Sequence, residues 1–332
     1  MKLVAGLDVG NTKTVAVVAD LDGQLRGIGR GGSGNWEWLG EQRAAELITQ
    51  VLTAALEMAQ ARREEVVHVH MGAAGMDWPD DVPRMAKAFQ DAGWRCLVVL
   101  ENDSFLTVRA GTPEGHGIGV TAGTGICVAI IRPEGEKYCY GGFTDLGGGH
   151  DSAGYAFQAV VRAEDGRGRP TALTEALLEA VGYASTRELV HDVHRRRHEI
   201  SNTVLNRVLF TTAAKGDPVA VEIVTRFASE LALCATNLIR RYRLTEKDLA
   251  VAAAGSRFTK TGPLLFEVFR REVLAVAPRA RVVLSEQPPV IGAVRAALAA
   301  CGSDRAEVWE VVKRAAEETA WFREDLGQTS EG

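Results

Sequence analysis

Two glycine turns offer the first candidate chemistry in this sequence. Residues 10–13 read Gly-Asn-Thr-Lys after the apolar run 3–9, and residues 123–125 read Gly-Thr-Gly after the mostly apolar run 119–122. Glycine leaves the backbone uncovered, so that consecutive N–H groups can converge on an anion. The threonine hydroxyls and the lysine add donors and positive charge. We therefore expect the turns to hold a polyphosphate; the competing interpretation of each turn is a simple hairpin connection.

The two turns belong to an internal repeat. Residues 119–131 align with residues 6–18 at a constant offset, since 119 − 6 = 113. In both copies an acidic residue and a glycine then form a second turn, at 22–23 and 134–135. Duplicated hairpins indicate twin domains that grip one ligand from both sides, and two unrelated hairpins are the alternative. The identical pairs are Gly6/Gly119, Gly10/Gly123, Val15/Val128 and Ala16/Ala129.

Asp8 lies inside the first apolar run, just before the first turn. A carboxylate in that place costs stability unless it is paired or binds a cation. Beside a phosphate cradle Mg²⁺ is the natural cation, held in part through water because it releases its waters reluctantly. The alternative is an aspartate that only caps the turn.

Asp103 follows the predicted strand 96–100, at the carboxyl end where open α/β sheets place their ligands. A carboxylate there can act as a general base, taking the proton of a substrate hydroxyl as that hydroxyl attacks a γ-phosphate. The alternative is structural: Asn102 or Asp103 caps the helix that follows.

The loop at residues 33–36 reads Ser-Gly-Asn-Trp and follows the third predicted strand. Asn35 can both donate and accept hydrogen bonds, as sugar hydroxyls require, and Trp36 offers an apolar face. The loop is thus a candidate sugar contact, although an ordinary surface loop can have the same composition.

A second polar loop spans residues 141–149 and contains five glycines. It leads to a helix that Asp151 or Ser152 could cap. So many glycines let backbone approach a ligand or let a domain hinge. The sequence is equally consistent with His150 as a ligand and with His150 as a residue that binds nothing.

These residues are positioned by strands that alternate with helices, which indicates an α/β fold. The predicted strands cover residues 3–9, 14–19, 25–29, 66–71, 96–100, 249–254 and 281–284, besides the repeated hairpin. The predicted helices cover residues 40–61, 81–91, 153–163, 171–181, 202–215, 218–242, 263–276, a segment after Pro288-Pro289, and 304–323, before a frayed tail at 327–332.

Composition excludes several classes of protein. The chain has 332 residues, enough for two domains, and a net charge of 38 − 43 = −5, unlike the basic footprint of a nucleic-acid binder. We interpret the arginines at 195–197 as a solvated helix face. No apolar run reaches the ~20 residues of a membrane span. Met1-Lys2 leads straight into a strand rather than a signal peptide.

Motifs exclude further classes of site. The five cysteines are odd in number and show no CxxC spacing, so we expect reduced thiols in a cytoplasmic protein and no zinc site. The sequence contains no GxxxxGK[ST] loop and no GxGxxG that opens a helix after a strand, which argues against P-loop and dinucleotide-binding folds. Nor does it contain the GxSxG elbow of a Ser-His-Asp hydrolase.

In this order, the segments resemble the acetate and sugar kinase/heat-shock protein 70/actin superfamily, and more narrowly the N-acetylglucosamine kinases of the BadF/BadG-type ATPase family. Residues 6–14 look like its phosphate-1 motif, 119–125 like phosphate-2, and 255–256 like the adenosine motif. Residues 213–218 and 289–293 match typical later stretches.

The resemblance implies two duplicated actin-like (ribonuclease H-like) domains flanking a nucleotide and sugar cleft. Their expected bounds are residues 1–112 and 113–302, followed by a helix and tail at 303–332. It also implies a homodimer that transfers phosphate from ATP to the 6-hydroxyl of N-acetylglucosamine.

The resemblance assigns roles to individual residues. Asp103 would be the catalytic base, and Mg²⁺ would lie near Asp8. The residues expected at the nucleotide are Gly10, Asn11, Thr12, Lys13, Gly123, Thr124, Gly125, Gly255 and Ser256. The residues expected at the sugar are Asn35, Trp36, Asn102, Asp103, Gly142, Phe143 and Asp151.

The sequence departs from the family's pattern after the second hairpin. Phe143 replaces the usual tryptophan, and Thr144 replaces the glycine after it. The family's sugar-contacting acid falls on Gly149, where Asp151 substitutes only if the loop is shifted. The acceptor therefore stays open between N-acetylglucosamine, glucosamine and other hexoses.

Two other functions remain open. One is a sensing module that binds sugar or nucleotide without catalysis, although no DNA-binding helix pair accompanies it. The other is an ATPase that activates a radical dehydratase through an iron–sulfur cluster. Those activators carry a cysteine where this chain has Val120.

Overall fold

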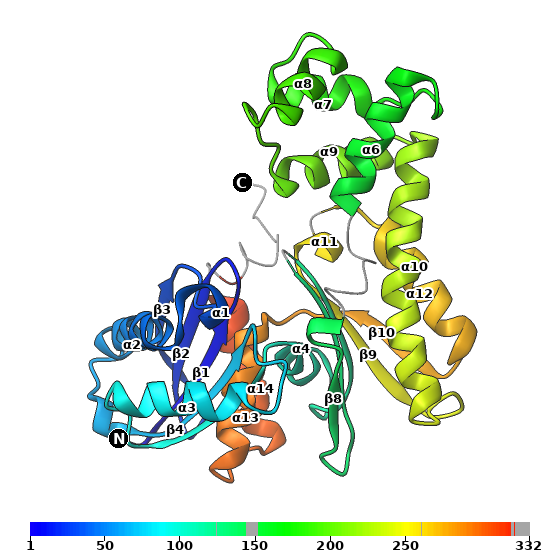
Figure 1. Cartoon of the computed structure of the whole chain (residues 1–332). Helices are drawn as coiled ribbons and strands as arrows, with labels where there is room; N and C mark the ends of the chain where they lie inside the picture. Colours follow the sequence, from blue (N-terminus) through cyan, green and yellow to red (C-terminus); the bar gives the residue numbers. More distant parts are fainter. Residues whose placement is uncertain (124, 144–151, 260, 320–321, 323–332) are drawn as a thin grey trace.

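Two mixed five-stranded sheets form the framework of the protein (Figure 1). The structure is a computed structural model that describes residues 1–123, 125–143, 152–259, 261–319 and 322. The first sheet has the order β3-β2-β1-β4-β5, and the second has the order β8-β7-β6-β9-β10. The strands are β1 (Leu3–Val9), β2 (Thr14–Asp20), β3 (Leu25–Gly31), β4 (Val66–Ala73), β5 (Leu97–Asn102), β6 (Gly117–Ala122), β7 (Ile126–Ile131), β8 (Lys137–Cys139), β9 (Leu249–Ala254) and β10 (Ala280–Leu284).

The two sheets have the same topology, which supports the predicted duplication. In each, an antiparallel three-stranded meander is extended by two parallel strands. The constant offset of 113 residues between the two copies, however, relates structurally equivalent residues only as far as the turn. Val9 pairs with Thr14 across four turn residues, whereas Ala122 pairs with Ile126 across three. Beyond the turn, the matched identities Val15/Val128 and Ala16/Ala129 therefore occupy non-equivalent positions.

One face of each sheet is covered by a helix that comes, along the chain, directly after the last strand of the other sheet. Helix α4 (Ser104–Gly111) leaves β5 and packs on β6, β7 and β9, while α13 (Pro289–Ala300) leaves β10 and packs on β1. Both approaches need glycine in the strand. A Cβ on Gly6 would lie 2.4 Å from Val294 N, and one on Gly119 would lie 2.8 Å from Val108 N. The repeated glycine pair thus marks where the crossing helices contact the strands.

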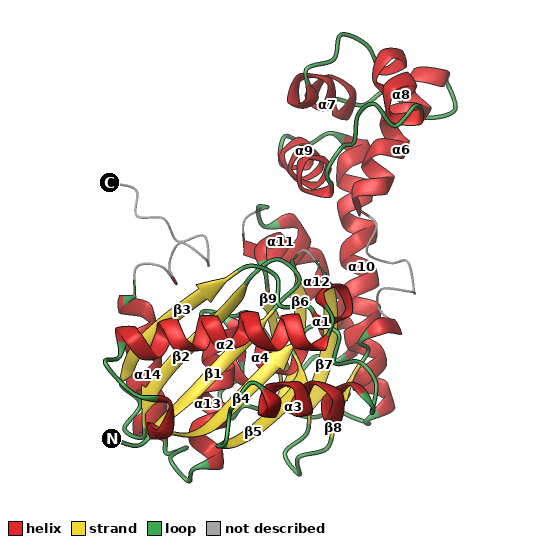
Figure 2. Ribbon diagram, turned by 60° about the vertical axis from the view of Figure 1, so that its left-hand side comes forward, coloured by secondary structure: helices red, strands yellow, loops and turns green. Residues whose placement is uncertain are grey.

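The remaining helices complete two lobes. Helices α2 and α3 lie on the outer face of the first sheet (Figure 2), and α14 packs beside α13. In the second lobe, α6 to α9 lie toward one end of the long helix α10, away from the sheets (Figure 1). These helices are α1 (Trp36–Leu39), α2 (Glu41–Met58), η1 (Arg63–Glu65), α3 (Asp81–Asp91), α6 (Ser152–Asp165), α7 (Leu173–Val181), α8 (Thr186–His194), α9 (Asn202–Ala214), α10 (Pro218–Arg241), α11 (Ser256–Thr259), α12 (Leu264–Val276) and α14 (Ala306–Glu318).

Most predicted elements are present. The predictions omitted the helices α1, α8 and α11 and the short 3₁₀ helix η1. The arginines at 195–197 lie in an exposed turn after α8 rather than on a helix face. The predicted tail at 327–332 lies outside the described residues. Over the part of the chain that the structure describes, no helix is long and apolar enough to cross a membrane.

Candidate nucleotide and sugar site

The two glycine turns face each other across the lobes. In the first, Gly10 N donates to Lys13 O over 2.9 Å; in the second, Gly123 N donates to Gly125 O over 2.9 Å. A Cβ placed on Gly125 would lie 3.5 Å from Asn11 Nδ2, so the second turn contacts the first. The predicted polyphosphate cradle would therefore lie where the two turns meet. Thr12 and Lys13 are exposed, whereas Thr124 lies outside the described residues.

Asp8 lies next to this cradle. It is partly exposed near the end of β1, in register with Val15 on one side and Gly72 on the other. Among the residues that the structure describes, no three His, Cys, Asp or Glu side chains group as a metal site. Mg²⁺ is commonly held by one or two carboxylates, with phosphate and water as its other ligands.

The expected adenosine motif lies beside the second turn. Gly255 follows β9 with a φ of +99°, and a Cβ there would lie 2.5 Å from Ala122 O. Only glycine accommodates both the conformation and the contact. Ser256 then begins the short helix α11. The end of strand β6 thus brings together the two segments of the second lobe that are expected to bind the nucleotide.

Asn35 links the first turn to the expected sugar loop. Its Nδ2 donates to Asn11 Oδ1 over 2.7 Å, and its Oδ1 accepts the Glu37 N–H over 2.8 Å as the cap of α1. Trp36 is buried: its indole N–H donates to Gly75 O, and the Arg84 guanidinium lies over its ring. In the structure Trp36 packs in the wall of the lobe rather than presenting an open apolar face.

The turn that carries Asp103 is held by its neighbour. Asp103 occupies the N-cap position of α4, but its side chain makes no capping hydrogen bond. Asn102 Oδ1 instead accepts the Ser104 N–H over 3.0 Å and the Ser104 hydroxyl. The capping role that we considered for both residues therefore belongs to Asn102, and Asp103 remains the candidate base.

The first three residues of the glycine-rich stretch, 141–143, lie against residues that no sequence pattern had singled out. A Cβ on Gly142 would lie 3.5 Å from Asp77 Oδ2, and the Phe143 ring meets Trp78 edge-on with centroids 5.7 Å apart. Asp77 also accepts a hydrogen bond from Asn102 Nδ2 over 2.7 Å. An aspartate and a tryptophan at the carboxyl end of a predicted strand were the available signal. Gly149, His150 and Asp151 lie outside the described residues.

Cys127 and Cys139 lie close to the turn between β5 and α4 that carries Asp103. The Cys127 thiol is 3.6 Å from Asn102 Oδ1. Burial raises the pKa of Cys127 well above its usual range and that of Cys139 to about 11. Both thiols are therefore protonated near neutral pH, which makes them poor nucleophiles.

Glu101 joins the two lobes at the sheet edges, and the sequence analysis missed it. This buried carboxylate of β5 contacts His70 Nε2 at 2.8 Å, Arg109 Nε at 3.0 Å and Lys137 Nζ at 2.7 Å. These partners come from β4, α4 and β8 respectively. Burial by itself would raise the pKa of Glu101, but the hydrogen bond from His70 and the charge of Arg109 hold it far below the usual range.

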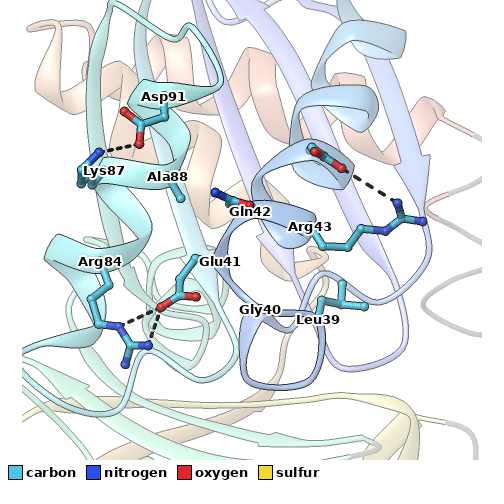
Figure 3. A pocket seen from close by; sticks show the side chains of 10 residues that line it. Leu39, Gly40, Glu41, Gln42, Arg43, Arg84, Lys87, Ala88 and Asp91 are labelled. Atoms are coloured by element: carbon cyan, nitrogen blue, oxygen red, sulfur yellow. Dashed lines mark hydrogen bonds and ion pairs between the residues drawn. The ribbon is translucent and has the colours of Figure 1, made fainter.

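A pocket of about 720 Å³ lies elsewhere, between α2 and α3 (Figure 3). Arg84 pairs with Glu41, and Lys87 pairs with Asp91, so its charges are largely neutralised within the wall. None of the expected site residues lines it. The candidate site is instead the place where the two turns meet.

Comparison with known proteins gives a consistent picture. The model of the BadF/BadG/BcrA/BcrD ATPase family matches residues 5–300. The N-acetyl-D-glucosamine kinase of Dictyostelium discoideum is 23% identical over 315 residues, which are 90% of this chain and 98% of that protein.

Solved structures share the fold. A Chromobacterium violaceum protein assigned as an N-acetylglucosamine kinase matches with a TM-score of 0.67 and 21% identity over 89% of this chain and 98% of that one. A ROK family glucokinase from Streptomyces griseus, solved with glucose and AMPPNP, matches with a TM-score of 0.57 and 20% identity over the same shares. These matches confirm the expected α/β fold with two flanking domains. Since the family model spans nearly all of both lobes, the chain belongs to the BadF/BadG/BcrA/BcrD ATPase family.

Proposed function

We propose that this protein is an ATP-dependent sugar kinase whose preferred phosphate acceptor is the 6-hydroxyl of N-acetylglucosamine. The observation that carries the proposal is the meeting of the two glycine turns across the lobes, with the Asp103 turn at the edge of the first sheet. The relatives named as N-acetylglucosamine kinases support the choice of acceptor.

In this proposal the nucleotide phosphates lie between the turns at residues 10–13 and 123–125. Backbone N–H groups, the Thr12 and Thr124 hydroxyls and Lys13 would bind the phosphate oxygens. Mg²⁺, when bound near Asp8, would neutralise charge on the phosphates. Gly255 and Ser256 would contact the adenosine.

Asp103 would accept the proton of the sugar hydroxyl as its oxygen attacks the γ-phosphorus. The bond from that phosphorus to the β–γ bridging oxygen breaks, and ADP leaves. Asn35, Asn102 and Gly142 would lie at the sugar, and closing of the lobes would exclude water that otherwise hydrolyses ATP.

The test is a screen of ATP consumption over amino sugars, their N-acetyl forms and neutral hexoses. We expect ADP release that depends on an amino sugar and exceeds the sugar-free control by at least tenfold. Sugar phosphate should form in equal amount. A preference for glucosamine or glucose would keep the kinase and change the acceptor. ADP release that no sugar stimulates would contradict the proposal, and tight binding without transfer would favour a sensing module.

A further inference from the structure

The loop between β4 and α3, residues 74–78, contacts all three segments expected at the sugar. Gly75 O accepts the indole N–H of Trp36 over 2.7 Å. Asp77 Oδ1 accepts from Asn102 Nδ2 over 2.7 Å. A Cβ on Gly142 would lie 3.5 Å from Asp77 Oδ2. One loop therefore touches the Trp36 loop, the Asp103 turn and residues 141–143 of the other lobe.

The loop is held firmly by its own ends. Ala74 N donates to Val9 O over 2.8 Å, which ties the loop to the end of β1. At the other end, Asp81 Oδ2 accepts the N–H groups of Asp77 (2.9 Å) and Trp78 (2.7 Å). Asp81 is only 4% exposed. The Asp77 carboxylate is therefore presented from a fixed backbone.

That carboxylate determines how the Asn102 amide is oriented. With Nδ2 turned toward Asp77, Oδ1 is directed to the Ser104 N–H at 3.0 Å. The second bond shapes the turn between β5 and α4, on which Asp103 stands. Loss of Asp77 would remove the contact that holds Nδ2, leave the amide held through Oδ1 alone, and so loosen this turn.

The neighbouring aromatic side chains extend the contact between the lobes. Trp78 is 48% exposed and Phe143 is 61% exposed, yet the two rings meet edge-on. Gly142, one of the residues expected at the sugar, lies against the same indole, since a Cβ there would be 3.7 Å from Trp78 Cζ2.

We propose that the β4–α3 loop forms part of the acceptor site, together with the Trp36 loop, the Asp103 turn and residues 141–143. Within this loop, Asp77 is a positioning residue for phosphoryl transfer. It acts through Asn102 and so holds the Asp103 turn in place. This inference rests on the proposed kinase function for its kinetic part alone.

The experiment compares Asp77→Ala, Asp77→Asn and the control Asp80→Ala. Asp80 is exposed at the start of α3 and makes no capping hydrogen bond. Because a small misplacement of reacting groups is costly, we expect Asp77→Ala to lower kcat roughly 10- to 100-fold, with the KM for ATP unchanged. More ATP should be hydrolysed per sugar phosphate formed. An asparagine at 77 can still accept from Asn102, so its kcat should stay within about fivefold of the parent.

Hydrogen–deuterium exchange supplies a readout that needs no substrate. In Asp77→Ala, the Ser104 amide should exchange faster than in the parent, while the amides of the core strands β1 and β4 keep the parent's rates. In the control Asp80→Ala, all of these amides should keep the parent's rates. A kcat within twofold of the parent together with unchanged exchange at Ser104 would overturn the inference. So would a general rise in exchange across the first lobe, which would make the role merely structural. Faster exchange confined to this turn, in a protein that phosphorylates no sugar, would support the positioning and refute the kinase.

Discussion

Asp103 is the residue on which the proposed chemistry depends. Its backbone begins α4, but the structure assigns the capping hydrogen bonds of that helix to Asn102. Changing the Asp103 side chain therefore removes no capping hydrogen bond from this helix. The structural and catalytic roles of this turn are thus separated between two adjacent residues.

Asp103→Asn should therefore lower kcat by about 10²–10⁴-fold, the usual loss when a general base is removed. The melting temperature should stay close to that of the parent, because no capping bond is lost. Steady-state kinetics with the best acceptor from the screen and a thermal unfolding curve provide the measurements. Near-full activity in the variant would exclude Asp103 as the base.

At the scale of elements, the exchange of helices between the lobes depends on small residues. The backbones of α13 and α4 contact β1 and β6 so closely that a single Cβ on Gly6 or Gly119 would overlap the helix. Gly292 makes the corresponding contact between the two helices, where a Cβ would lie 2.2 Å from Leu106 O. These contacts form the joint between the lobes.

Gly6→Ala should destabilise the protein by about 1–3 kcal/mol, since overpacking forces backbone to move. Gly32→Ala is the matched control, because a Cβ there meets nothing within 4 Å. Urea unfolding of both variants at equal protein concentration gives the comparison. Equal free energies of unfolding for the two variants would show that α13 shifts to make room for the added methyl group without any loss of stability.

For the whole molecule, the buried Glu101 is an electrostatic contact between the edges of the two sheets. It bonds to Lys137 of the second lobe as well as to Arg109 of the crossing helix α4. The side chain is 7% exposed, so the contacts are poorly screened by solvent. Breaking a buried pair of this kind commonly costs more than the pair itself contributes.

Glu101→Gln should lower the free energy of unfolding by about 3 kcal/mol at pH 7. The pKa of Glu101 is lower in the folded than in the unfolded protein, so its stabilisation is complete above the unfolded pKa of roughly 4.3. It is lost as the pH falls through the folded pKa. The difference between parent and variant should therefore be constant from pH 7 to about 5 and shrink below about 4. Urea unfolding across this range measures it, and a difference that grows in acid would contradict the assignment.

Local signals in the chain were enough to predict the α/β class, the duplicated hairpins and the residues of both turns. Glycine placement, alternation of apolar residues and helix caps act over a few residues, so they can be seen without a fold. Contacts between distant segments left no such signal. Asp77 meets Asn102 and Gly142, and Glu101 meets Lys137, only because β4, β5 and the strands of the other lobe converge. The one-residue difference between the turns likewise emerged only from strand pairing, because register is set by hydrogen bonds across the sheet.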